Sequence, residues 1–234
     1  MMRMKTLGIV GGIAPESTIE YYRLLIAGYR DRCADGSYPP LFINSIDVNK
    51  VLALAARADR EELMGYLVAS LIPLAHAGAD FALIASNTPH IVFPEIAKKS
   101  PLPLISIVEA TRDFATAGKF KKLGLFGTRS TMQGGFYQKA FLERGMKIIL
   151  PTVQEQDYIH EKYVGELVAG RFLPEIREQF IFIISRLRDE GQIDGLILGG
   201  TELPLLLRDD TAIGIPLLNT ARIHVQAALD RMFS

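Results

Sequence analysis

The sequence predicts an α/β protein made of two pseudo-symmetric lobes, each a mostly parallel sheet flanked by helices, with the active-site cleft between them. Short aliphatic runs of strand length alternate with longer amphipathic segments, a pattern typical of parallel βα units. The clearest run lies within Asp80–His90, where apolar residues end abruptly in Ser86, Asn87 and Thr88 before a proline. Ligands of open α/β sheets bind beyond the carboxyl ends of such strands, so these three polar residues are candidate site residues.

An internal repeat is the second observation that predicts two lobes. The run Asp80–His90 returns 114 residues later as Asp194–Pro204, an alignment that places Gly200 opposite Ser86. A second pair of apolar strands is offset by 116 residues and comprises Thr6–Gly12 and Lys122–Thr128. Self-similarity at nearly one spacing indicates a duplication of roughly 115 residues. Chance similarity between buried strands is the alternative.

The lobes are expected to be discontinuous in sequence. We predict that residues 1–103 and 219–234 form the first lobe and that residues 104–218 form the second. The final helix would then pack back on the first lobe. The chain has no Pro/Gly/Ser-rich linker and no low-complexity tract, so the lobes are expected to be tightly joined.

The first lobe begins with a strand at residues 5–12 that runs into Gly12, where the backbone can turn tightly and approach a ligand. An amphipathic helix opens at Glu16. The face of this helix that we predict to be buried comprises Ile19, Tyr22, Leu25 and Ile26. Further strands are predicted at 41–46, 80–85 and 104–107, and further helices at 58–77, which Pro73 would kink or divide, and at 90–98 and 109–117.

The second lobe repeats this alternation. Strands are predicted at 123–127, 147–150, 194–199 and 215–218, and helices at 135–144, 157–169 and 174–190, before the final helix at 220–232. A polar loop follows the first of these strands and contains Thr128, Ser130 and Thr131. These hydroxyl groups suit a nest for a substrate carboxylate, and they equally suit helix capping, so the two roles are compatible.

The composition excludes several classes of partner. Lys+Arg and Asp+Glu both number 26, so no net charge attracts nucleic acid or an anionic membrane. No stretch approaches the ~20 apolar residues of a membrane span. Cys33 is the single cysteine, and the four histidines lack zinc-ligand spacing, so neither a disulfide nor a metal site is expected. We expect a cytoplasmic protein that binds a small molecule.

The order of short motifs resembles the aspartate/glutamate racemase family over essentially the whole chain. The motifs are Thr6–Gly12 with Glu16–Thr18 and Tyr21-Tyr22, Gly78–Asp80, Ser86–His90, Gly127–Met132, Gly199–Glu202 and Asn219–His224. Each is weak alone, but six in register indicate the family. The resemblance implies two α/β lobes related by a pseudo-twofold axis, a small amino acid or dicarboxylate as the ligand, and no cofactor, neither pyridoxal phosphate nor a metal. A homodimer is the expected assembly.

The resemblance also implies two cysteines, one in each lobe, on opposite faces of the substrate Cα. One thiolate removes the proton and the opposing thiol delivers another. The matching positions are Ser86 and Gly200 in this chain. A serine hydroxyl is a far weaker acid than a thiol of pKa about 8.5, so Ser86 carries almost no alkoxide near neutrality. The two-thiol mechanism is therefore out of reach.

Three interpretations of the function remain open. In the first, the chain is a racemase or isomerase of a small, acidic amino acid in which Ser86 relays a proton and Glu202 or His90 acts as base. Glu202 has a helix N-terminal charge as its alternative role, and His90 a structural one. In the second, the fold serves decarboxylation or elimination, which relatives with one thiol and one glycine perform. In the third, the protein binds a small carboxylate and catalyses nothing.

The expected substrate contacts lie at the same strand ends. Asn87, Thr88 and Thr201 would hold the substrate by hydrogen bonds, with satisfaction of the strand-end backbone as the alternative. The resemblance places Lys50 about where relatives hold a cation for a distal carboxylate. The position that is a lysine in some relatives, near Val168, is apolar here.

Overall fold

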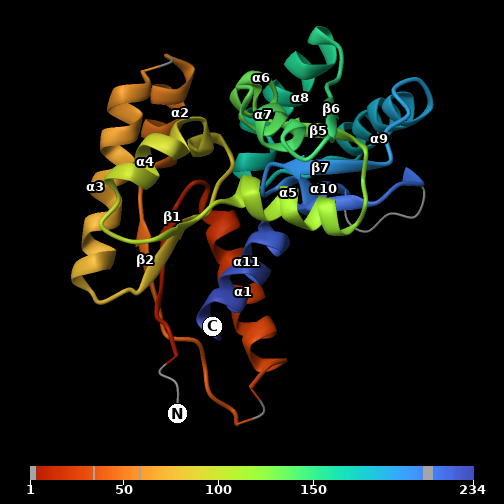
Figure 1. Cartoon of the computed structure of the whole chain (residues 1–234). Coiled ribbons are helices and arrows are strands. Elements are labelled where there is room, and N and C mark those ends of the chain that lie inside the picture. Colours follow the sequence, from red (N-terminus) through yellow and green to blue (C-terminus); the bar gives the residue numbers. More distant parts are fainter. Residues whose placement is uncertain (1–3, 34, 58, 208–212) are drawn as a thin grey trace. The chain divides into compact units, whose positions relative to one another are not determined.

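The computed structural model describes residues 4–33, 35–57, 59–207 and 213–234. The chain divides into two compact units, one comprising Met1–Ala110 with Ala221–Ser234 and the other Thr111–Thr220 (Figure 1). Each unit contains a four-stranded sheet in which the paired strands are parallel. The predicted fold class, two α/β lobes with parallel sheets flanked by helices, is confirmed. Within the described ranges, none of the helices combines the length and the apolar character that crossing a bilayer requires.

The first unit has the strand order β2-β1-β3-β4. Helix α5 (Ile107–Ala117) leads from it to the second unit. The other elements of the first unit are β1 (Leu7–Gly11), α1 (Pro15–Arg30), β2 (Leu41–Ser45), α2 (Val48–Ala56), α3 (Arg60–His76), β3 (Phe81–Ile84), the 3-10 helix η1 (Thr88–Val92), α4 (Phe93–Lys99), β4 (Leu104–Ile105) and α11 (Thr220–Met232).

Alternate side chains of the two central strands pack against different helices. Those that pack with α1 and α11 include Leu7, Ile9, Phe81 and Leu83. The intervening residues Val10, Ala82 and Ile84 pack with α2, α3 and α4. Figure 1 shows α1 in red and α11 in blue side by side. The final helix of the chain therefore completes the core that the first strand begins.

The buried face of α1 differs from the predicted one. The buried residues of α1 are Ser17, Tyr21, Leu25 and Tyr29. Of the predicted set, Leu25 is buried and Ile26 is partly buried, but 56% of Ile19 and 47% of Tyr22 is exposed. Apolar residues surround much of this helix, so its periodicity leaves the phase open. Packing against α11, a segment distant in the chain, selects the face with two tyrosines.

Three short helices lie in segments for which the sequence pattern predicts no helix. Helix α2 begins directly after Asp47, whose side chain accepts a hydrogen bond from the Asn49 N–H at 2.8 Å. Helices α6 (Arg129–Gln133) and α10 (Leu203–Leu207) follow strand ends of the second unit. Short helices of this kind lack the apolar periodicity on which the prediction relies.

The predicted helix at 58–77 corresponds to α3, and residue 58 lies outside the described residues. Helix α3 runs through Pro73 without interruption, so the proline does not divide it. Pro73 lies within the last turn, where the helix ends at His76. A break would expose the apolar face that Leu71 and Leu74 bury on each side of the proline.

The second unit has the strand order β6-β5-β7-β8. Its further elements are β5 (Lys122–Gly127), α7 (Phe136–Leu142), β6 (Lys147–Ile149), α8 (Val153–Gly165), the 3-10 helix η2 (Leu167–Ala169), α9 (Pro174–Asp189), β7 (Gly195–Gly199) and β8 (Leu217–Asn219). The order matches that of the first unit strand for strand, with β5 in the place of β1 and β7 in the place of β3. These are the two strand pairs that the sequence repeat aligns.

The repeat extends to the acid that opens each central strand. In the first unit, Asp80 Oδ2 accepts from the Thr6 N–H at 2.7 Å, and the Asp80 N–H donates to the Thr6 carbonyl at 2.8 Å. In the second, Asp194 Oδ2 accepts from the Lys121 N–H at 2.7 Å, and the Asp194 N–H donates to the Lys122 carbonyl at 2.8 Å. Each aspartate thus ties the start of one central strand to the start of its neighbour.

We expect Asp80→Ala to lower the free energy of unfolding by about 1–3 kcal/mol, because the substitution leaves a strand-end N–H without its charged acceptor. Asp80→Asn keeps an acceptor oxygen in place and should recover a substantial part of the loss. Urea unfolding followed by circular dichroism measures both variants. A loss of equal size in Asp80→Asn would contradict the assignment to this hydrogen bond.

Candidate functional site

The polar cluster of the first unit follows β3 directly. Ser86, Asn87 and Thr88 are all buried, although each carries a polar side chain. Val10 of β1 pairs with Ile84 of β3, so the chain beyond both strands emerges at one edge of the sheet. The carboxyl edge of a parallel sheet is where ligands of such folds bind.

Gly12 lies at this edge in a tightly packed turn. Its φ of +81° favours glycine, and a Cβ there would lie 2.6 Å from Ser45 Oγ at the end of β2. The Gly12 N–H donates to Thr18 Oγ1 at 2.7 Å. The glycine therefore lets the end of β1 meet the end of β2 and the first turns of α1.

Lys50 lies on α2, a helix that the sequence pattern does not predict. The residue is exposed, and its Nζ is 4.4 Å from the centroid of the Tyr66 ring, a cation–π contact. Tyr66 belongs to α3. The contact therefore holds the ammonium group against the neighbouring helix.

His90 holds the backbone beside Ser86 through hydrogen bonds at both of its ring nitrogens. Its Nδ1 lies 3.0 Å from the Ser86 carbonyl, and its Nε2 lies 3.2 Å from the Ile107 N–H. A carbonyl can only accept and an N–H can only donate, so the proton is on Nδ1 and the ring is neutral. Burial, with a smaller contribution from His224, lowers the pKa of His90 to about 3. Both ring nitrogens are occupied, which leaves neither for a substrate proton.

His224 of α11 has the complementary tautomer. Its Nε2 donates to the Ile105 carbonyl at 3.0 Å, and its Nδ1 accepts from the Tyr21 hydroxyl at 2.9 Å. Burial lowers the pKa of His224 to about 4. The His90 and His224 rings meet edge to face with their centroids 6.4 Å apart. This buried pair ties the loop after β3 to the final helix.

The polar cluster of the second unit follows β5 and β7, which end side by side with Gly127 opposite Gly199. Thr128 Oγ1 accepts from the Thr131 N–H at 3.2 Å and lies 3.1 Å from Thr131 Oγ1. Thr128 is therefore the N-cap of α6. Both threonines are buried and Ser130, between them, is half-buried.

Glu202 is a buried side chain just beyond β7, with only 1% of its surface exposed. Its Oε2 accepts a hydrogen bond from the Tyr163 hydroxyl, and Thr201 Oγ1 donates to the same oxygen at 3.2 Å. Burial, followed by the negative charge of Glu202, raises the pKa of Tyr163 well above its ordinary value. The tyrosine therefore keeps its proton, and the carboxylate is the group of this pair that can gain one.

Gly200 allows the Tyr163 ring to approach the end of β7. A Cβ built on Gly200 would lie 2.7 Å from Tyr163 Cζ and 2.8 Å from the Tyr163 hydroxyl oxygen. The ring thus fills the space into which a side chain at position 200 would project. Nothing in the sequence pattern points to Tyr163, because no local pattern pairs a residue of one helix with a glycine so much further along the chain.

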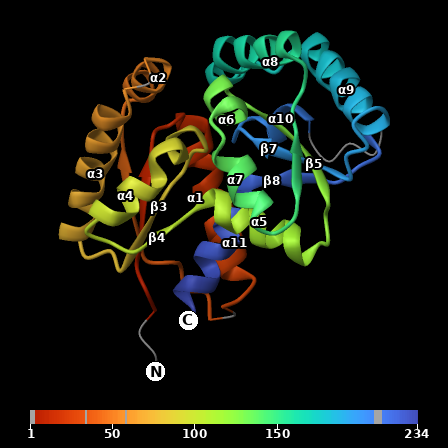
Figure 2. The ribbon, with the colours of Figure 1, turned by 45° about the horizontal axis from the view of Figure 1, so that its top comes forward.

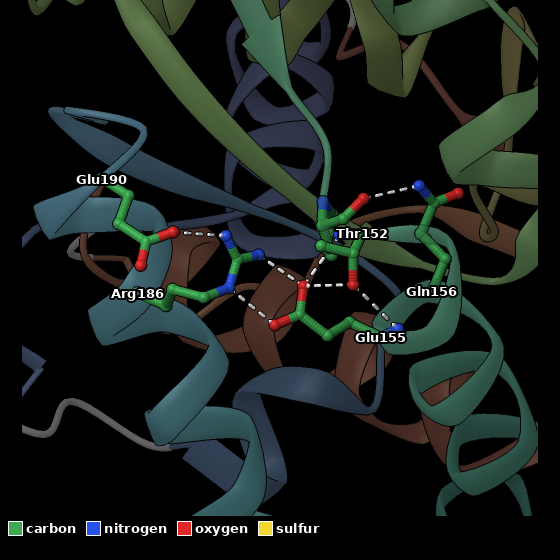
Figure 3. A network of polar contacts seen from close by, with 6 residues as sticks. Thr152, Glu155, Gln156, Arg186 and Glu190 are labelled. Carbon is green, nitrogen blue, oxygen red and sulfur yellow. Dashed lines mark hydrogen bonds and ion pairs between the residues drawn. The ribbon is translucent and has the colours of Figure 1, made fainter.

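Helix α8, which carries Tyr163, is fixed at its N-terminus by the polar network in Figure 3. Thr152 and Glu155 form a capping box, and Arg186 of α9 donates to both carboxylate oxygens of Glu155. Burial alone would raise the pKa of Glu155, but hydrogen bonds from Arg186 and Thr152 outweigh it and hold that pKa below its usual range. Arg186 also pairs with Glu190 at 3.1 Å.

Helices α8 and α9 lie together on one side of β5 and β7 (Figure 2). On that side, the Phe180 ring of α9 packs edge to face against Phe126 of β5, with the centroids 5.7 Å apart. The capping network and this aromatic contact set the position of Tyr163 relative to the strand end. Among the residues that the structure describes, no three His, Cys, Asp or Glu side chains form a group that could hold a metal ion.

Comparison with protein families gives a match over most of the chain. The family model described as Asp/Glu/hydantoin racemase matches residues 10–228. Among curated proteins, the glutamate racemase of Aquifex aeolicus is 25% identical over 65% of this chain and 59% of its own length. The glutamate racemase of Corynebacterium kroppenstedtii is 28% identical over 63% of this chain and 50% of its own length. The chain therefore spans between half and three-fifths of these relatives.

Solved structures match over almost the whole chain. A putative Asp/Glu racemase from Yersinia pestis is 31% identical with a TM-score of 0.88, covering 99% of this chain and 100% of its own. An aspartate racemase homologue from Pyrococcus horikoshii OT3 is 30% identical with a TM-score of 0.84 and the same coverage. The glutamate racemase of Francisella tularensis in complex with D-glutamate, at 13% identity and a TM-score of 0.68, shares the fold over 98% of this chain and 81% of its own.

Proposed function

The chain belongs to the Asp/Glu/hydantoin racemase family, and from this premise we propose that it moves a proton at the Cα of a small, acidic amino acid. The observation that carries the proposal is the buried Glu202 carboxylate at the end of β7, where two hydroxyl groups converge on one oxygen. A buried, hydrogen-bonded carboxylate beyond a strand end is a suitable general base. We assign that role to Glu202.

Ser86 and Gly200 stand at the positions where the family resemblance implies two cysteines. Cys33, the single cysteine, follows α1 and lies in neither strand-end cluster. Proton transfer in this chain therefore proceeds without a thiol. Ser86 contributes a hydroxyl that can pass a proton or donate a hydrogen bond, and His90 positions it through the Ser86 carbonyl.

Binding of the substrate is assigned to the remaining polar groups at the strand ends. Asn87, Thr88 and Thr201 hold the α-substituents, while Gly12 shapes the turn beside the first two. The burial of all three polar side chains supports this assignment, because ligand sites place a few polar groups in surroundings shielded from water.

The carboxylates of the substrate are assigned to two further places. The capped loop with Thr128, Ser130 and Thr131 receives one of them, and Lys50 serves the distal carboxylate of an acidic substrate. The names of the relatives, glutamate racemases and an aspartate racemase homologue, support an acidic amino acid. The chain's own residues supply the acid and base groups, so the proposal includes neither pyridoxal phosphate nor a metal.

Decarboxylation or elimination is the second candidate function. The glycine at position 200 favours it, because such a reaction needs a proton donor on only one face of the carbanion. Release of carbon dioxide from a substituted malonate, without α-proton exchange in any amino acid, would support this candidate over the first. A protein that binds a carboxylate without catalysis would show neither carbon dioxide release nor α-proton exchange.

We expect the purified protein to exchange the α-proton of L- or D-aspartate or glutamate with solvent in heavy water, measured as loss of the α-proton signal by NMR. Glu202→Gln should slow the exchange of at least one enantiomer roughly 100-fold or more, the usual contribution of a general base. Ser86→Ala should slow it by a smaller factor. Glu178→Gln, which changes an exposed carboxylate on α9, is the matched control and should leave the rate unchanged. Exchange of both enantiomers at the wild-type rate in Glu202→Gln would remove Glu202 from the chemistry.

A further inference from the structure

We propose that the Tyr163 hydroxyl occupies the place of the side chain missing at position 200 and relays a proton between the substrate Cα and Glu202. This inference rests on the proposed function and adds a residue that no sequence motif identifies. It makes Tyr163 the group that touches the substrate, while Glu202 acts through it.

The position of the hydroxyl is the first support. A Cβ at residue 200 would meet Cζ and the hydroxyl oxygen of Tyr163 at 2.7 and 2.8 Å. The hydroxyl therefore lies in the space that a short side chain on that residue would occupy. Gly200 follows β7 directly, at the carboxyl edge of the sheet, where ligands of α/β folds bind.

The second support is the hydrogen bond between Tyr163 and Glu202. The Tyr163 hydroxyl donates to Glu202 Oε2, and both side chains are largely shielded from water, at 6% and 1% exposure. Thr201 Oγ1 donates to the same carboxylate oxygen. A hydroxyl already hydrogen-bonded to a carboxylate can accept a proton at its oxygen while it releases its own to the partner.

The relay balances without any further reactant. In the forward step the Cα–H bond breaks, its proton bonds to the Tyr163 oxygen, and the electron pair stays on Cα. In the same step the former hydroxyl proton of Tyr163 bonds to Glu202 Oε2. Tyrosine ends as it began, neutral, and Glu202 becomes a carboxylic acid. The reverse step returns a proton to Cα from the same side.

The surroundings of Tyr163 favour the neutral tyrosine both before and after the proton transfer. The raised pKa of Tyr163, caused by burial and the charge of Glu202, makes a free tyrosinate unfavourable in this position. A relay avoids that state, because the proton gained and the proton lost move together. The capping network at the start of α8 and the packing of α9 hold the tyrosine in place.

The test compares exchange of the two enantiomers of aspartate and glutamate in heavy water for the wild type, Tyr163→Phe and Glu202→Gln. A group on one side of Cα removes the proton of only one enantiomer. We therefore expect both variants to slow exchange of the same enantiomer roughly 100-fold and to change the other by less than about threefold. Tyr158→Phe removes a hydroxyl from the same helix and is the matched control, expected to match the wild type.

The other possible results of this experiment each show whether the relay or the proposed function is wrong. Exchange lost in Glu202→Gln but retained in Tyr163→Phe would overturn the relay and leave the proposed function standing, with Glu202 acting directly. Equal losses for both enantiomers would assign Tyr163 a structural role and overturn the relay. No exchange in the wild type would overturn both proposals.

A solvent isotope effect keeps the relay testable if thermal melting shows that Tyr163→Phe does not fold. The relay moves the Tyr163 hydroxyl proton, which exchanges with solvent, in the same step as the Cα proton. Release of tritium from α-tritiated substrate by the wild type should therefore be slower in heavy water than in light water. Direct removal by Glu202 moves no solvent-derived proton, so equal rates in the two solvents would overturn the relay.

Discussion

Gly200→Ala is expected to lower the free energy of unfolding by about 2–4 kcal/mol, a large effect for the addition of one methyl group. The new Cβ would overlap the Tyr163 ring, so the ring must move. Moving it breaks the hydrogen bond to Glu202, and both groups are buried. The energetic costs of overpacking and of an unsatisfied buried polar group then add. Urea unfolding followed by circular dichroism measures the loss.

A double-mutant cycle separates this clash from other effects. In a Tyr163→Ala background the ring is gone, and Gly200→Ala should cost less than about 0.5 kcal/mol, as expected when the interaction partner has been removed. Gly165→Ala, at an exposed glycine of α8 with no atom near its would-be Cβ, is the matched control and should be neutral or slightly stabilising. A Gly200→Ala variant as stable as the wild type would show that Tyr163 does not occupy this space.

The same clash changes how a thiol could be introduced at this strand end. Gly200→Cys places its Cβ against the Tyr163 ring, so we expect the single variant to be destabilised like Gly200→Ala. Combination with Tyr163→Ala opens the space for the sulfur. Glycine at position 200 and tyrosine at position 163 are therefore parts of one packing arrangement.

Acidification is expected to destabilise the protein before most carboxylates are protonated. The pKa of His90 falls from 6.5 to about 3 and that of His224 from 6.5 to about 4 on folding, in both cases chiefly through burial. At these two residues the unfolded chain therefore binds more protons than the folded one between about pH 7 and the folded pKa values of about 3 and 4, and their contribution makes stability fall as the pH falls in that range. Between pH 7 and pH 5 the two histidines together should cost about 3–4 kcal/mol.

Urea unfolding at several pH values measures this dependence. His90→Gln should be less stable at pH 7, because its backbone partners are disturbed, but its stability should depend less steeply on pH between 7 and 5. His76→Gln changes an exposed histidine at the end of α3 and is the control for the substitution itself. An unchanged slope in His90→Gln would contradict the assignment of a neutral, buried His90.

The central strands are predictable from sequence because their residues are apolar on both faces, as β3 and β7 illustrate. The repeat then predicts two similar sheets. The phase of α1 is not predictable, because Tyr21 is buried by α11, a segment distant in sequence. Helix α2 is missed because its start depends on the Asp47 cap rather than on apolar periodicity.

The candidate site, like the fold, is predictable from sequence only in part. Sequence position alone brings Ser86, Asn87 and Thr88 to a strand end, because they follow one. The partner of Glu202 stays hidden, since Tyr163 comes from a different helix and the contact depends on the lack of a side chain at Gly200. Contacts of this kind form only in the folded structure, so local sequence patterns do not predict them.

The return of α11 to the first unit has a consequence for synthesis on the ribosome. The face of the sheet and of α1 that includes Leu7, Tyr21 and Leu25 is covered by α11. Residues 111–220 are translated before that helix, and they form a unit continuous in sequence. The second unit can thus finish folding while the first still exposes an apolar face. The first unit is therefore begun first and completed last. Until α11 packs against it, its apolar face is open to chaperones and to aggregation.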